Sequence, residues 1–314
     1  MPDERQPAGI AFALRDPWRW PAFSGLARLG EALAYGAVFL PEIDGRDTFA
    51  ALTGLAAETD RLGLATGVVP MTSRRTRTTA MGAATVHERS GGRAILGLGT
   101  GPARPGALDA LRGQVGELRA LLAGEPVEGV EPLSLALPSP VPIWIAALGP
   151  RAVALAGELA DGVLLNWCDP GRVARARQAI EEAAETAGRD PGSVSIGVYV
   201  RASLGEDPAA EMGALRTMTG EYASYPAYAR QFAAMGLAEE VAVAAAAHRA
   251  GVSDDVPEAL VRAVALVGEP AASRARLDAY TEAGADLTVV YPVAAGADGA
   301  VSVASTLEAL APGR

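Results

Sequence analysis

A glycine-rich turn directly after an apolar run is the first feature of the sequence that could hold a ligand. Residues 93–98 read as a buried strand, and Gly97, Gly99 and Gly101 let the backbone make close approaches that a side chain would prevent. At the carboxyl end of a parallel strand, such a turn is a usual ligand-binding place in an α/β protein. It lacks the third glycine of a dinucleotide fingerprint and the Lys-Ser/Thr of a phosphate loop. The turn therefore indicates a loop that binds a ligand, without indicating which ligand. The alternative is a tight turn at the end of the strand that binds no ligand.

A second candidate is the segment Gly149-Pro150-Arg151, which has the pattern of a helix with proline in its first turn. The free N–H groups at such a start attract an anion. If this segment and residues 99–101 follow neighbouring strands, the two loops could share a phosphate group. Plain helix initiation is the alternative interpretation.

The composition excludes several kinds of catalytic site. Lysine is absent, which excludes Schiff-base chemistry on lysine and with it pyridoxal-phosphate enzymes and lysine aldolases. The single Cys168 excludes an internal disulfide and a thiolate metal cluster. His87 and His248 are the only histidines and are far apart, so we expect no metal site and few possible bases for a Ser-His-Asp triad.

The charge of the chain bears on its partners and location. The formal net charge is −10, so we expect no binding to nucleic acid or to an anionic membrane. Residues 1–5 lack the apolar segment of a signal peptide, and no apolar run reaches the roughly 18 residues of a membrane span. The expected location is the cytoplasm.

Segments with strand and helix patterns alternate along the chain. Eight apolar segments read as strands, and residues with helical spacing separate them. This order predicts parallel pairing and a closed (β/α)₈ TIM barrel, an α/β fold forming a single domain over residues 1–314. An open doubly wound sheet is the competing architecture. A helical insertion at about 205–266 precedes the eighth strand and could cover one rim as a lid. The predicted strands are 9–14, 37–40, 63–69, 93–98, 141–146, 162–166, 193–202 and 286–291.

In a barrel of this kind the chemistry lies at the carboxyl ends of the strands. The residues that follow these strands include few metal ligands or nucleophiles and many backbone, amide and aromatic groups. Such a rim suits a cofactor that supplies its own chemistry. The rim segments include Glu42, residues 66–68, 99–101, 147–151 and 166–168, Arg201 and Tyr291.

Three blocks that span nearly the whole chain resemble the luciferase-like family of flavin- and deazaflavin-dependent oxidoreductases. The blocks are residues 93–101 with 80–85 and 90–92 before them, residues 142–151 running into 157–164, and residues 267–270 leading to 283–286. The resemblance implies a barrel that holds FMN or coenzyme F420 at its rim. The region of Tyr228, Gly236 and Val256-Pro257 is similar to compact members that are mostly F420-dependent.

The resemblance also implies roles for single residues. Gly67-Val68 matches a bulge in the third strand where the family often has a non-proline cis peptide behind the cofactor ring. Residues 99–101, with Leu148 and Gly149, match loops near the cofactor's phosphate and ring. Glu42 matches an acid that often faces the substrate and is the catalytic candidate, although an ordinary strand-end acid is the alternative. The expected cofactor-binding residues are Thr66, Gly67, Val68, Gly99, Thr100, Gly101, Ala147, Leu148, Gly149, Pro150 and Asn166.

Two further features have two interpretations each. Arg74, Arg75 and Arg77 could meet the acidic tail of F420 or only solvate the start of a helix. Trp167 and Tyr291 could stack beside the cofactor ring or only fill the mouth of the barrel.

The leading hypothesis is an F420-dependent oxidoreductase that moves a hydride between the deazaflavin and a small organic substrate. An FMN-dependent monooxygenase served by a separate reductase and a non-catalytic flavin or deazaflavin binder are the alternatives. Members that oxidise sugar phosphates have histidine where Ile43 stands, and the connection after Gly101 is short, so the resemblance does not supply the substrate. The family tendency implies a homodimer.

Overall fold

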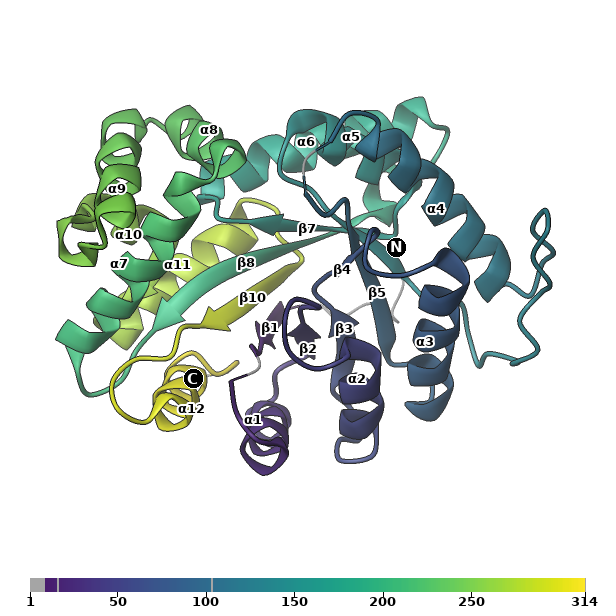
Figure 1. The fold of residues 1–314 in the computed structure, drawn as a ribbon, viewed down its shortest axis with the longest axis horizontal. Coiled ribbons are helices and arrows are strands. Elements are labelled where there is room, and N and C mark those ends of the chain that lie inside the picture. Colours follow the sequence, from purple (N-terminus) through teal and green to yellow (C-terminus); the bar gives the residue numbers. More distant parts are fainter. Residues whose placement is uncertain (1–8, 16, 103, 314) are drawn as a thin grey trace.

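A closed barrel of eight parallel strands forms the centre of the molecule (Figure 1). The computed structural model describes residues 9–15, 17–102 and 104–313. β10 pairs with both β1 and β8, so the first and last barrel strands meet. The predicted TIM barrel is confirmed, and the open doubly wound sheet is wrong. The barrel strands are β1 (Gly9–Ala13), β2 (Ala37–Leu40), β3 (Gly63–Thr66), β5 (Ala94–Gly99), β6 (Ile143–Ala146), β7 (Gly162–Asn166), β8 (Ser195–Ser203) and β10 (Leu287–Pro292).

Two short strands extend the barrel at its carboxyl rim. β4 (Val69–Pro70) pairs with the end of β5, and Gly67-Val68 separates it from β3, so the third predicted strand forms two pieces. β9 (Ala265–Val267) pairs with the end of β8. The sequence predicted a helix up to Leu266 there. The helix ends at Val264 because the next residues are buried against β8 and complete its hydrogen-bond ladder.

Helices cover the outside of the barrel and connect successive strands, as right-handed βα units require. The apolar spacing of residues 48–62 predicts one helix after β2, but the helix ends at Ala56 and residues 57–62 form a turn that leads into β3. The helices around the barrel are α1 (Trp20–Ala32), α2 (Thr48–Ala56), α3 (Thr76–Arg89), α4 (Ala107–Leu122), α5 (Pro150–Leu159), α6 (Pro170–Thr186), α11 (Pro270–Glu282) and α12 (Gly299–Ala309).

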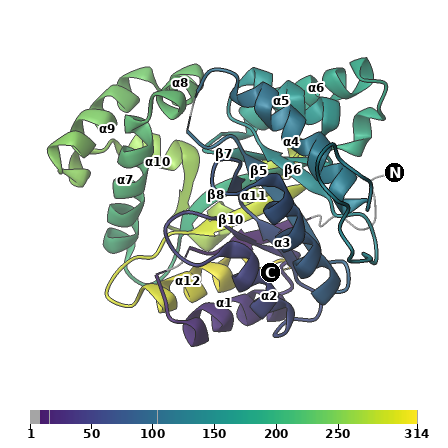
Figure 2. The same cartoon turned by 45° about the vertical axis from the view of Figure 1, so that its right-hand side comes forward.

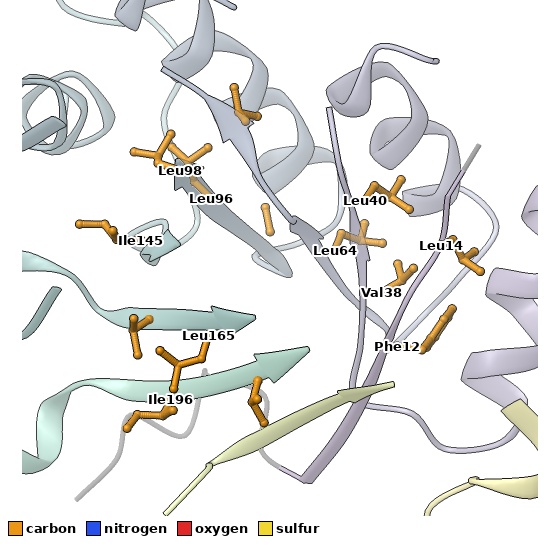
Figure 3. Packing of buried hydrophobic residues seen from close by; sticks show 14 of the residues in the cluster. Phe12, Leu14, Val38, Leu40, Leu64, Leu96, Leu98, Ile145, Leu165 and Ile196 are labelled. Atoms are coloured by element: carbon orange, nitrogen blue, oxygen red, sulfur yellow. The ribbon is translucent and has the colours of Figure 1, made fainter. Parts of the chain in front are cut away.

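The alternation of side chains along each strand produces two packed layers. Outward-facing residues such as Phe12, Val38 and Leu64 pack against the surrounding helices in one apolar cluster, part of which Figure 3 shows. Inward-facing residues such as Phe39 and Trp144 fill the barrel in a second cluster. The barrel is therefore a filled core, and a ligand can enter only at a rim.

Four further helices leave the barrel after β8 and gather on one side of it, drawn in green in Figures 1 and 2. Their apolar faces belong to the same cluster as the barrel interior, which contains Leu215 and Phe232 together with Trp144 and Tyr199. The helices therefore pack onto the carboxyl mouth of the barrel. They are α7 (Pro208–Ser224), α8 (Pro226–Ala234), α9 (Ala238–Ala250) and α10 (Glu258–Val264).

Among the described residues, no helix has both the length and the apolar character needed to cross a membrane. Residues 1–5, on which the expected cytoplasmic location partly rests, lie outside the described part of the chain.

Candidate functional site

A cleft of about 1120 Å³ opens at the carboxyl rim, a volume that suits a cofactor-sized ligand. One wall comes from the segments after β3, β5 and β6, and the other from the end of β7, from β8 and from α8. The structure brings together all of the predicted cofactor-binding residues except Thr66. Those that line the cleft are Gly67, Val68, Gly99, Thr100, Gly101, Ala147, Leu148, Gly149, Pro150 and Asn166.

The first wall, which we call the glycine wall (residues 67–70, 99–102 and 146–150), is shaped by missing side chains. A Cβ atom on Gly67 would lie 1.9 Å from the Tyr199 hydroxyl, and one on Gly99 would lie 2.8 Å from Val68. Gly101 has φ of +69°, a conformation that favours glycine. The peptide bond between Gly67 and Val68 is cis, as the family resemblance implied. Backbone groups therefore form this wall, and a ligand can approach them closely.

Thr66 lies behind the glycine wall and does not line the cleft. Its buried hydroxyl donates to the Gly97 carbonyl and accepts from the Gly97 amide, both at 2.8 Å. Gly97 is needed here, because a Cβ atom on it would lie 2.1 Å from the Thr66 carbonyl. Thr66 thus joins β3 to β5, and the structure gives its side chain no path to a ligand in the cleft.

Glu42 also lies outside the cleft lining. Its carboxylate accepts from the Ser73 hydroxyl at 2.9 Å and from Arg74 Nε at 2.8 Å, and Arg74 Nη2 lies 2.8 Å from its Oε2. Arg74 also pairs with Asp47 and lies over the Phe49 ring. Hydrogen bonding to Glu42 raises the pKa of Arg74. The structure thus gives Glu42 an ion-pair role, and its catalytic role stays a prediction.

Two of the three arginines that follow the third strand, Arg74 and Arg77, bond to other residues of the protein. Arg74 is held by the two acids, and Arg77 donates to the Glu131 carbonyl. Arg75 is exposed at the residue that precedes α3. None of the three lines the cleft.

The second wall, which we call the aromatic wall, contains Asn166, Tyr199, Tyr225, Tyr228 and Gln231. Tyr199 donates to the Gly67 carbonyl at 2.9 Å and so bridges the two walls directly. Asn166 Nδ2 lies 2.9 Å from the Tyr228 hydroxyl. The Gln231 amide donates to the Asn166 carbonyl at 2.7 Å, which ties α8 to the end of β7. The position of the insertion helices is thereby fixed relative to the barrel mouth.

A buried cation lies behind this wall. Arg201 of β8 is only 2% exposed, and its guanidinium donates to Asn166 Oδ1. The guanidinium lies 4.2 Å from the ring centroid of Tyr291 and 4.5 Å from that of Trp167. Aromatic faces attract a cation and offset part of the cost of burying it. Within the described residues, Arg201 forms no ion pair, and its Nε atom has no hydrogen-bond partner.

Trp167 and Tyr291 are both buried, and neither lines the cleft. Trp167 also packs against Tyr222 of the insertion, with ring centroids 4.8 Å apart. Of the two interpretations of Trp167 and Tyr291, the geometry favours the one in which their side chains fill the mouth of the barrel. Both rings also contact the Arg201 guanidinium.

The charges around the cleft have one sign. Arg172, Arg175 and Arg230 line it, and no aspartate or glutamate is among the described residues that do so. Arg172 Nη2 donates to the Leu148 carbonyl at 2.8 Å, and the amino end of α5 at Pro150 lies on the same side. In a chain of net charge −10, such a cleft attracts an anionic ligand.

Sequence reasoning placed Arg201 at the rim but not in the site, and it missed Tyr228, Arg172, Arg175 and Arg230 as lining residues. A lone arginine in the otherwise apolar stretch 194–202 was the one usable signal. The arginines of α6 and α8 look like ordinary exposed helix residues in sequence, and only the fold turns them toward a common space.

The remaining candidate groups lie apart from the cleft. His87 is buried, and its Nε2 lies 3.0 Å from the Ser139 hydroxyl. Burial raises the pKa of the Cys168 thiol to about 12, so this group stays protonated and unreactive at neutral pH. The described residues contain no group of three or more His, Cys, Asp or Glu side chains that could hold a metal ion.

The fold and the cleft together define a barrel protein with a cofactor-sized cleft, lined by three arginines, at its carboxyl rim. The sequence pattern of the luciferase-like monooxygenase family matches residues 14–287. The chain therefore belongs to this family, and it is an oxidoreductase of the luciferase-like type.

Comparison with two relatives agrees with this assignment. The chain is 33% identical over 221 residues to the 5,10-methylenetetrahydromethanopterin reductase of Methanolobus tindarius, a match that covers 64% of this chain and 66% of that protein. It is 25% identical over 308 residues to a Mycobacterium tuberculosis protein assigned as a coenzyme F420-dependent oxidoreductase, with 84% and 89% covered. The chain thus spans just under two thirds of the first relative and most of the second.

A solved structure supports the fold. The coenzyme F420-dependent tetrahydromethanopterin reductase from Methanopyrus kandleri superposes with a TM-score of 0.75 at 20% identity, over 95% of this chain and 97% of that one. At this identity the likeness concerns the fold alone.

Proposed function

We propose that this protein is an F420-dependent oxidoreductase that transfers a hydride between the deazaflavin cofactor and a small organic substrate. The observation that carries the proposal is the cleft with three arginines and no described acid in its lining. F420 has a phosphate and an acidic glutamate tail, so it is a better electrostatic match for this lining than a ligand with a single anionic group. Relatives named for F420 support the same choice.

The residues of the cleft fit such a cofactor. The glycine wall presents backbone groups to a cleft of about 1120 Å³, which a flat ring could enter. Gly67 and Gly99 are needed for this packing, because Cβ atoms on them would collide with neighbouring protein atoms. Gly149-Pro150 at the amino end of α5 and the side chains of Arg172 and Arg175 would hold anionic groups. When bound, the deazaflavin supplies hydride chemistry, and the protein supplies binding, orientation and exclusion of water.

The substrate, the partners and the location belong to the same proposal. A small-molecule substrate would enter beside the aromatic wall. A homodimer, a cytoplasmic location and the absence of nucleic-acid and membrane partners stay predictions. A separate cofactor reductase stays a prediction as well.

The FMN-dependent monooxygenase is the competing function, favoured by the family description and by the single phosphate that FMN would place at α5. Separate fluorescence titrations of the purified protein with F420 and FMN test the choice. We expect F420 to bind more tightly than FMN, and we expect turnover that does not require oxygen. Binding of FMN without binding of F420, with oxygen-dependent turnover, would reverse the assignment.

A further inference from the structure

The hydroxyl groups that line the cleft differ in whether their protons are donated to an acceptor within the protein. Tyr199 donates to the Gly67 carbonyl at 2.9 Å, and Tyr225 donates to Glu221 Oε1 at 2.8 Å. Thr100 donates to the Gly101 carbonyl at 3.2 Å. Tyr228 is different, because among the described residues its only hydrogen-bond partner is the Asn166 amide.

The orientation of that amide follows from the buried arginine. A guanidinium has only donors, so the Asn166 atom that faces Arg201 must be the oxygen, Oδ1. The amide nitrogen then faces Tyr228, and the Tyr228 oxygen must accept. The phenolic proton is consequently free to point into the cleft that Tyr228 lines.

We infer that Tyr228 is the proton donor of the reaction and that Asn166 and Arg201 are the residues that position it. The inference rests on the proposed function and adds to it the substrate class, a carbonyl compound. As the carbonyl carbon receives a hydride, with its two electrons, from the reduced deazaflavin, the π pair of the C=O bond moves onto oxygen. The Tyr228 O–H bond breaks, and a new O–H bond forms on that oxygen. The substrate is reduced to an alcohol, the cofactor is oxidised, and the phenolate recovers its proton from solvent.

The surroundings of Tyr228 suit both its protonated form before donation and its phenolate form afterwards. Burial raises the pKa of Tyr228, so the phenol carries its proton at neutral pH. Tyr222 and Tyr225 contact its ring with centroids 4.9 Å and 6.5 Å away. The Asn166 amide and the Arg201 charge act in the opposite direction and stabilise the phenolate after donation.

The chemistry of the substrate follows from the presence of a donor. Hydride addition to a carbonyl leaves an alkoxide that must be protonated, whereas hydride addition to an iminium carbon gives a neutral amine without a proton. A free phenolic proton beside the cofactor cleft therefore favours substrates whose reduction consumes a proton as well as a hydride, such as carbonyl compounds, over preformed iminium ions.

The first test needs neither cofactor nor substrate. In protein labelled with ¹³Cζ-tyrosine, the Tyr228 signal is assigned by its loss in Tyr228→Phe and is then titrated. We expect Asn166→Leu to raise the pKa of Tyr228 by about one unit, because the phenolate loses its hydrogen-bond donor. The control Tyr35→Phe, which removes a hydroxyl that bonds the Leu307 carbonyl far from the cleft, should leave this titration unchanged. An unchanged pKa in folded Asn166→Leu overturns the inference.

The second test is a single turnover of the F420-loaded protein. Reduced F420 is mixed with small ketones and aldehydes, including cyclohexanone and benzaldehyde, and the oxidised cofactor is followed by absorbance. Loss of a general acid should slow Tyr228→Phe by about 10²–10⁴-fold and remove the solvent deuterium isotope effect on the step. F420 affinity should change by less than about threefold, and Tyr35→Phe should retain the full rate.

The outcomes separate the inference from the proposed function. Failure of the unmodified protein to bind F420 defeats the proposed function. Binding of F420 with no oxidation by any carbonyl compound in the panel overturns only the inference. So does an equal rate for Tyr228→Phe and the unmodified protein.

Discussion

The two walls of the cleft are built by opposite means. The glycine wall takes its shape from backbone and from side chains that are missing, at Gly67, Gly99 and Gly101. The aromatic wall takes its shape from large side chains such as Tyr228, brought to the rim by helices inserted after β8. The first wall follows the barrel strands directly, and the second depends on tertiary packing of the insertion.

This difference decides what each wall can do and what it tolerates. The glycine wall offers a close approach for a flat ligand and has no room for an added atom. The aromatic wall carries the hydroxyl groups and, behind them, the buried charge of Arg201, so it can provide proton chemistry and substrate contacts. One hydrogen bond, from Tyr199 to the Gly67 carbonyl, holds the walls together directly.

The largest effect on cofactor affinity is expected where the two walls meet. In Gly67→Ala the new Cβ atom would lie 1.9 Å from the Tyr199 hydroxyl, so the bridging hydrogen bond breaks and both walls shift. Overpacking of this kind should lower the free energy of unfolding by about 1–3 kcal/mol. Because both walls of the cleft move, F420 affinity should also fall, by about tenfold or more. Fluorescence titration measures the affinity, and urea denaturation measures the free energy of unfolding.

Gly116→Ala is the matched control for that substitution. Gly116 is an exposed residue within α4, and an added Cβ there meets no atom within 4 Å. The affinity should not change, and the free energy of unfolding should rise by about 0.5–1 kcal/mol, because alanine favours a helix. An equal loss of affinity in both variants would show that the steric clash at Gly67 is not the cause of the loss.

A smaller effect is expected from the charges around the cleft. The double variant Arg175→Ala, Arg230→Ala removes two exposed cations that line the cleft. Exposed ion pairs contribute about 0.2–1 kcal/mol each, so F420 affinity should fall by about 2–30-fold. The dependence of affinity on salt concentration should weaken as well.

Arg249→Ala is the control for charge alone, because Arg249 is exposed on α9 and does not line the cleft. Its affinity for F420 and its salt dependence should match those of the unmodified protein. If the double variant behaves in the same way as this control, the cleft arginines do not face the cofactor.

Glu42 is expected to matter for stability more than for cofactor affinity. Its side chain is 11% exposed and pairs with Arg74, which keeps Asp47 as a second partner. Glu42→Gln should lower the free energy of unfolding by about 1–3 kcal/mol, the usual cost of weakening a buried charged hydrogen bond. F420 affinity should change by less than about threefold. A loss of turnover with unchanged stability would instead restore the catalytic role predicted from sequence.

The smallest effect at neutral pH, and a distinctive one at high pH, is expected from the tyrosines of the barrel mouth. Burial raises the pKa of Tyr199, Tyr228 and Tyr291, so the unfolded chain loses these protons first. Stability is therefore unaffected below about pH 10 and falls as pH rises toward the folded pKa values. Each tyrosine contributes a slope of up to about 1.4 kcal/mol per pH unit.

Comparison of Tyr228→Phe with the unmodified protein in urea denaturation between pH 9 and 11 isolates one such contribution. The variant should show the shallower alkaline decline, because it has one proton fewer to lose in the unfolded state. An identical decline would mean that Tyr228 is not buried as described.

The same contrast explains what the sequence could predict. Alternating strand and helix patterns predicted the barrel, and the loop glycines predicted one wall of the cleft, because both are local properties of the chain. The pairing of Glu42 with Arg74 joins residues 32 positions apart, and no local pattern indicates it. Tyr228 and Arg230 lie on α8, whose orientation depends on packing over the mouth, and Arg172 lies near the start of the barrel helix α6. No local pattern distinguishes these residues from ordinary surface residues.

The account as a whole depends on the ligand lying between the two walls, and a crystal structure of the protein with F420 tests this most directly. We predict electron density for the deazaflavin between Gly67-Val68 and the aromatic wall, with its anionic groups toward Pro150 and Arg172. Density for the cofactor outside this cleft, or an F420-saturated crystal with the cleft filled only by solvent, would contradict the account.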